Sequence, residues 1–87
     1  MKNKFLDIKA RYPDDEHTID SLVVQDPEFR ALCEDYDVCI TALRHWSRSC
    51  EPEAGIRVGE YSTLAEELEK EVAQVLEALE RNRNRLC

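Results

Sequence analysis

The strongest constraint on this chain is a pair of apolar repeats whose members are separated alternately by three and four residues. The members of the first repeat are Phe29, Leu32, Tyr36, Cys39, Leu43, Trp46 and Cys50. The members of the second repeat are Val58, Tyr61, Ala65, Leu68, Val72, Val75 and Leu79. A mean spacing of about 3.5 residues places every member of a repeat on one side of an α-helix. The two repeats therefore predict two long helices, each with one apolar face.

The first long helix is expected over residues 26–50. Its start is marked by Asp26 and Pro27, because aspartate accepts hydrogen bonds from the free amides of a helix start and proline suits the first helical position. The segment that follows residue 50 contains both Pro52 and Gly55, which favour a turn.

The second long helix is expected over residues 60–87, after a turn over residues 51–59. An earlier start at Pro52 stays open, because Val58 continues the second repeat backwards. That earlier start would place Gly55 and Gly59 inside the helix, where glycine is unfavourable.

Residues 1–25 are expected to form two short helices. The first begins near Phe5 and ends at Tyr12, because Pro13 disfavours helical geometry in the residue before it. The second follows an acidic start that suits the helix dipole. Its narrow apolar face consists of Ile19, Leu22 and Val23.

Together these segments predict one all-α domain, an antiparallel, coiled-coil-like helical hairpin with short N-terminal helices. A lone hairpin would leave large side chains in water, so either the N-terminal helices or a second copy of the chain must cover them. We expect a homodimer built as a four-helix bundle. The candidate interface residues are Phe29, Tyr36, Leu43, Trp46, Tyr61 and Leu68.

Charge and composition narrow the functional classes. The chain has 87 residues, of which 12 are basic and 19 acidic, and its formal net charge is −7. A nucleic-acid partner is not expected, because nucleic-acid binders carry a net basic face. No apolar run is long enough to span a membrane, and no apolar stretch follows the first lysines as in a secretory signal. We therefore expect a cytoplasmic protein.

The residues that carry chemistry do not form a recognisable site. Cys33, Cys39 and Cys50 are expected to be small buried side chains, and Cys87 an exposed terminal thiol. No pair has the C-x-x-C spacing of zinc or redox motifs, and His45 has no helical neighbour relation to a cysteine. We expect no catalytic residues, no metal ligands and no cofactor.

The order of residues around the first helix start resembles that of a known group. Asp26-Pro27-x-Phe29-x-x-Leu32-x-x-x-Tyr36, followed by a second charged helix, is similar to the small bacterial helical-hairpin proteins of the YdcH type. The resemblance covers about residues 18–80 and implies a helical hairpin. It implies no catalytic residues, because the proteins of this type are largely without assigned activity.

The sequence therefore predicts a non-enzymatic protein that associates with itself or with a partner through its heptad faces. The alternative is a thiol- or metal-responsive sensor that uses Cys39, Cys50, His45 or Cys87. An enzyme with a site formed only at an oligomer interface is a third possibility.

Overall fold

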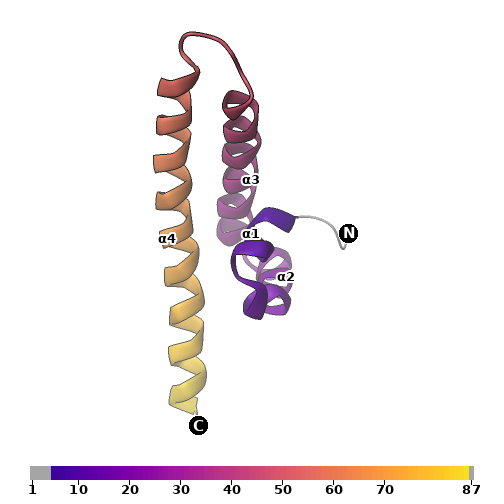
Figure 1. The fold of residues 1–87 in the computed structure, drawn as a ribbon. Coiled ribbons are helices and arrows are strands. Elements are labelled where there is room, and N and C mark those ends of the chain that lie inside the picture. The colour runs from indigo at the N-terminus through magenta and orange to yellow at the C-terminus, as the bar shows by residue number, and fades with distance from the viewer. Residues whose placement is uncertain (1–4, 87) are drawn as a thin grey trace.

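The computed structural model describes the backbone of residues 5–86 and the side chains of residues 5–81. Within these residues the chain is all-α, as predicted, and contains no strand. The elements are α1 (Leu6–Arg11), the short 3-10 helix η1 (Pro13–Asp15), α2 (Glu16–Gln25), α3 (Pro27–Ser47) and α4 (Ala54–Leu86). Helices α3 and α4 run antiparallel as a hairpin, and α4 extends beyond the start of α3 (Figure 1).

The start of α3 agrees with the sequence prediction. One carboxylate oxygen of Asp26 accepts hydrogen bonds from the backbone N–H groups of Glu28, at 3.0 Å, and Phe29, at 3.2 Å. These bonds satisfy two amides that have no partner within the helix. The helix ends at Ser47, three residues before the expected end, and Cys50 lies exposed in the connection. The prediction that Cys50 is buried is therefore wrong.

Helix α4 begins at Ala54, inside the segment expected to be a turn over residues 51–59. This start is closer to the alternative at Pro52 than to the expected start at residue 60. Both glycines lie within the helix, and neither has a positive φ. The connection after α3 spans only residues 48–53. The apolar positions of the second repeat therefore belong to one continuous helix of 33 residues.

Substitution of Gly59 by alanine is expected to raise the free energy of unfolding by about 0.5–1 kcal/mol, because alanine loses less backbone entropy than glycine in a helix. No heavy atom lies within 4 Å of the position that the new Cβ would take, so no clash offsets this gain. Urea denaturation followed by circular dichroism measures the change. Lower stability of Gly59→Ala would mean that the helix does not pass through residue 59.

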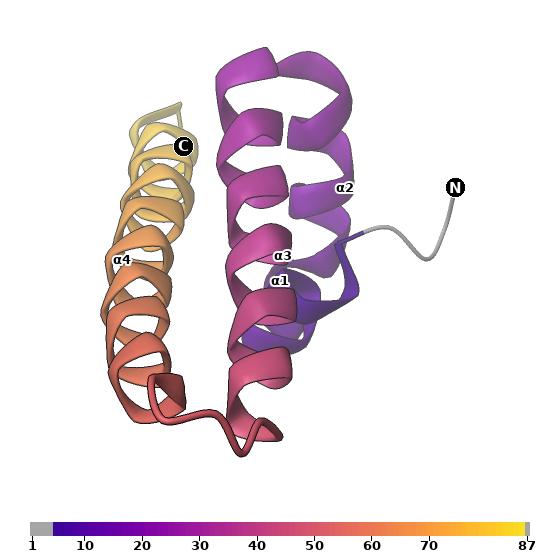
Figure 2. The same ribbon diagram turned by 90° about the horizontal axis from the view of Figure 1, so that it is seen from above.

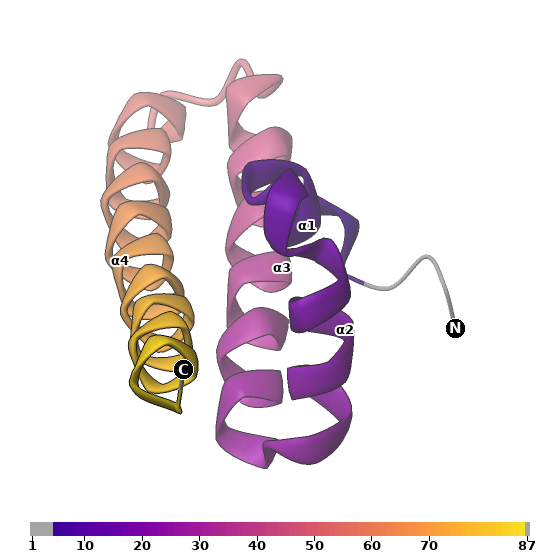
Figure 3. The same cartoon turned by 90° about the horizontal axis from the view of Figure 1, so that it is seen from below.

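Helices α1 and α2 cover one flank of the hairpin. In Figures 2 and 3, α2 lies beside α3 on the side away from α4, and α1 overlaps α3 in both views. The end of α1 also reaches α4, where Arg11 pairs with Glu69. Ile8 of α1 and Ile19 of α2 are fully buried and belong to the same apolar cluster as Phe29, Tyr36 and residues of α4. The buried members of this cluster are Phe5, Ile8, Ile19, Phe29, Cys33, Tyr36, Cys39, Ala65, Leu68, Val72 and Leu76.

This packing corrects the premise of the predicted dimer interface for two residues. Phe29 is 2% exposed and Tyr36 is 4% exposed within a single chain. Both belong to the cluster that joins Ile8 and Ile19 to residues of α4, so a single chain buries both side chains without a second copy. The N-terminal helices thus contribute to covering the apolar faces that a lone hairpin would leave in water.

Polar contacts connect the end of α1 to α4, and α1 to α2. Glu69 of α4 accepts a hydrogen bond from the Tyr36 hydroxyl, at 2.6 Å, and forms an ion pair with Arg11, at 3.3 Å. The Tyr12 hydroxyl donates to the backbone carbonyl of Glu69 at 3.0 Å. Between α1 and α2, the buried Lys9 ammonium lies 2.6 Å from the Asp20 carboxylate. The N-terminal cover is therefore held by directed contacts as well as by apolar packing.

Loss of the Tyr36 hydroxyl is expected to lower the free energy of unfolding by about 1.5–3 kcal/mol at neutral pH, the range for a hydrogen bond to a charged group. Burial, then the hydrogen bond to Glu69 and its negative charge, raise the pKa of Tyr36 above its ordinary value of 10.0. Since the folded state holds this proton more tightly, the stabilisation is complete below pH 10 and is lost as the pH rises towards the raised pKa.

Tyr36→Phe should therefore reduce the loss of stability above pH 10. Urea titrations between neutral and alkaline pH measure both effects. Tyr12→Phe is the comparison and should have a smaller effect. Burial, then the charge of Glu69, also raise the pKa of Tyr12, but its hydroxyl donates to a backbone carbonyl and not to a carboxylate. An unchanged alkaline slope in Tyr36→Phe would contradict the prediction.

Candidate functional site: the open face of the hairpin

The flank of the hairpin that α1 and α2 leave uncovered carries a groove between α3 and α4. The larger part has a volume of about 630 Å³ and is lined by residues of the two long helices and by Asp26. A smaller hollow of about 220 Å³ continues it and shares Asp35 and Leu68 with it. We call the two together the open groove. Its lining residues are Asp26, Glu28, Phe29, Ala31, Leu32, Asp35, Val38, Cys39, Tyr61, Leu64, Leu68, Glu71, Gln74, Val75 and Ala78.

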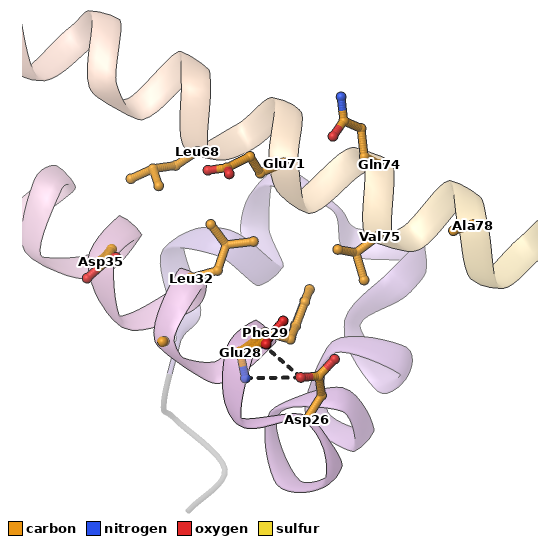
Figure 4. A pocket seen from close by; sticks show the side chains of 11 residues that line it. Asp26, Glu28, Phe29, Leu32, Asp35, Leu68, Glu71, Gln74, Val75 and Ala78 are labelled. Atoms are coloured by element: carbon orange, nitrogen blue, oxygen red, sulfur yellow. Dashed lines mark hydrogen bonds between the residues drawn. The ribbon is translucent and has the colours of Figure 1, made fainter.

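The floor of the open groove is apolar. Figure 4 shows Leu32 pointing from α3 towards α4, with Leu68 and Val75 pointing from α4 towards α3. Two apolar side chains that line the smaller hollow are exposed to solvent: Val38 is 68% exposed and Leu64 is 43% exposed. Apolar side chains that lie together in a groove between two helices provide a surface on which a further apolar helix face can be buried.

The rim of the open groove is acidic. Glu28 and Asp35 lie seven residues apart on the same side of α3, and Glu71 faces them from α4. All three are exposed, and no lysine or arginine is among the residues that line the groove. None of the three carboxylates forms an ion pair within the described part of the chain. The fourth acidic residue, Asp26, is engaged in capping α3.

The predicted interface residues are divided between the groove and the rest of the molecule. Tyr61 and Leu68 line the open groove, and the buried Phe29 forms part of its floor. The buried Tyr36 does not line it. Leu43 and Trp46 are half-buried nearer the end of α3 and also lie outside the groove lining.

Sequence reasoning missed the residues that make the groove distinctive, although a signal for them exists. Val38, Leu64 and Glu71 each come one position before a member of an apolar repeat. The same holds for Glu28, Ala31, Asp35, Gln74 and Ala78. Positions that precede repeat members lie on one flank of a helix, and in an antiparallel pair the equivalent flanks lie on the same side. A comparison of the residues before and after each repeat member would have identified this flank as the one that carries acidic and exposed apolar side chains.

Two of the four cysteines are buried thiols of low expected reactivity. Cys33 and Cys39 are buried. Burial, followed by the charges of two nearby acidic residues, raises the pKa of Cys33 to about 12. Burial and the charge of Glu69 raise the pKa of Cys39, and its thiol donates a hydrogen bond to the Tyr61 carbonyl at 3.1 Å. A raised pKa lowers the thiolate fraction and with it the reactivity of a cysteine.

Among the described residues, His45 and Cys50 complete no metal site with these thiols. The His45 ring packs edge-on against Trp46, with 5.1 Å between the ring centroids. Among the described residues, no three His, Cys, Asp or Glu side chains gather as a metal site. Cys50 is exposed, and Cys87 lies outside the described residues.

No protein-family model, curated protein or solved structure matches this chain. In the part of the chain that the structure describes, no helix combines the length and the apolar character needed to cross a membrane. The open groove is therefore the surface from which we infer a function.

Proposed function

We propose that this protein is a non-enzymatic interaction module, which receives a helix of another polypeptide in the open groove between α3 and α4. The observation that carries the proposal is the exposed apolar pair Val38 and Leu64 at the mouth of a groove with an apolar floor. Side chains of this size gain free energy on leaving water, at about 25 cal/mol per Å² of apolar surface buried.

The arrangement of the long helices supports this role. Two antiparallel helices with one flank uncovered offer a third helix a continuous seam, as in a three-helix bundle. The opposite flank is already occupied by α1 and α2, which make the hairpin a complete scaffold. A partner therefore adds to a preformed surface, which lowers the cost of ordering on binding.

Site-specific crosslinking in the native cell tests this function. A photoreactive amino acid at position 64, in the groove, is expected to yield one or a few discrete adducts with other polypeptides. The matched control is position 24, because Val24 is 85% exposed and lies on α2, away from the groove. Equal adduct patterns at positions 64 and 24, or none at position 64, would contradict the proposal.

A further inference from the structure

We propose that the occupant of the open groove is a basic amphipathic helix of a partner protein, with an apolar stripe flanked by lysine or arginine. This inference rests on the proposed function and specifies the chemistry of its partner.

The length of the groove sets the length of the occupant. Along α4 the lining residues run from Tyr61 to Ala78, which corresponds to about 26 Å of helix at 1.5 Å per residue. A partner helix of about 17 residues, or between four and five turns, matches this span. Its apolar residues at every third or fourth position would meet Leu32, Leu64 and Leu68.

The rim charges set the sign of the flanking residues. Glu28 and Asp35 border the groove on α3, and Glu71 borders it on α4. Glu67 is also exposed and lies on the same side of α4, three residues after Leu64 and four before Glu71. A helix in the groove would place the residues beside its apolar stripe next to these carboxylates, as in coiled coils, where such flanking charges select the partner. Lysine or arginine at those positions gives attraction on both sides of the groove.

The same charges disfavour a second copy as the occupant. A two-fold axis through the open groove would bring the same surface of each chain together. Glu28, Asp35 and Glu71 of one chain would then face the same carboxylates of the other, with no lining cation to separate them. Like charges placed opposite each other across an interface oppose association.

Two designed peptides of 17 residues test the chemistry of the occupant. Both carry leucine at helical spacing, and the remaining positions are lysine and alanine in the basic peptide, or glutamine and alanine in the neutral one. Fluorescence anisotropy of the labelled peptides with the full chain measures their affinities. We expect the basic peptide to bind at least about tenfold more tightly than the neutral one, and its affinity to fall with added salt.

Two sets of variants locate the binding site. The groove set, Glu28→Lys, Asp35→Lys and Glu71→Lys together, should weaken binding of the basic peptide at least about tenfold. The control set, Glu53→Lys, Glu66→Lys and Glu77→Lys, changes the net charge equally at exposed positions outside the groove lining and should change the affinity less than about threefold. Should the groove set fail to give a folded spectrum, Glu28→Gln, Asp35→Asn and Glu71→Gln remove the charges with nearly the same shapes.

The outcomes separate this inference from the proposed function. If both peptides bind equally, and Leu64→Ser weakens both, the groove binds helices and the requirement for basic residues is wrong. If no groove variant alters binding of either peptide, both proposals fail. Light scattering in reducing buffer could instead give about twice the 10.1 kDa protomer mass, with Leu64→Ser returning the mass to that of one protomer. In that case a second copy is the occupant and the inference is overturned.

Discussion

Replacement of Phe29 by alanine is expected to lower the free energy of unfolding by about 3–5 kcal/mol, the range for removing a buried aromatic side chain. Phe29 is 2% exposed and belongs to the cluster that joins the N-terminal helices to the hairpin. Because small domains have a total stability of about 5–15 kcal/mol, this change should leave a large part of the protein unfolded at moderate temperature.

Urea denaturation followed by circular dichroism measures the loss in Phe29→Ala. Glu67→Ala serves as the control, since this exposed residue on α4 should contribute less than about 0.5 kcal/mol. A loss below about 1 kcal/mol in Phe29→Ala would contradict the burial of this side chain in the shared cluster.

Removal of residues 1–25 is expected to convert the protein into a self-associating species. The deletion takes away Ile8 and Ile19, which are buried in the same cluster as Phe29, Cys33 and Tyr36. A hairpin with both flanks open would expose a large apolar surface, which two chains can bury against each other.

Size-exclusion chromatography with light scattering in reducing buffer compares the truncated chain with the full chain. We expect the truncated chain to show at least about twice its protomer mass at micromolar concentration. A matched test without deletion is Ile8→Asp with Ile19→Asp, which places charges in the same contact. A truncated chain that is folded and has its protomer mass would contradict the assigned role of the N-terminal helices.

Local sequence signals were sufficient to predict the two long helices. The cap at Asp26 and the alternation of three and four residues act over one or two turns, so they are visible without knowledge of the fold. The start of α4 was misplaced because glycine is unfavourable in isolated helices. In the folded chain Val58 and the later apolar residues of α4 belong to one continuous helix that includes both glycines.

The candidate site was only partly predictable. Leu68 and Tyr61 were recognised as members of a repeat, and both line the open groove. Phe29 and Tyr36 were placed at an interface between chains, because a repeat marks a face as apolar and does not identify what covers it. In the structure both side chains are buried in one cluster with Ile8 of α1, Ile19 of α2 and residues of α4.

What the sequence alone determined is the class of fold, the two long helices and their apolar faces, since each depends on spacing within a helix. Only the tertiary structure decided which flank of the hairpin is closed and which is open. That choice depends on contacts between distant segments, such as Tyr36 with Glu69 and Arg11 with Glu69. The burial of Lys9 has the same origin, because a lysine is buried only where folding supplies a partner such as Asp20.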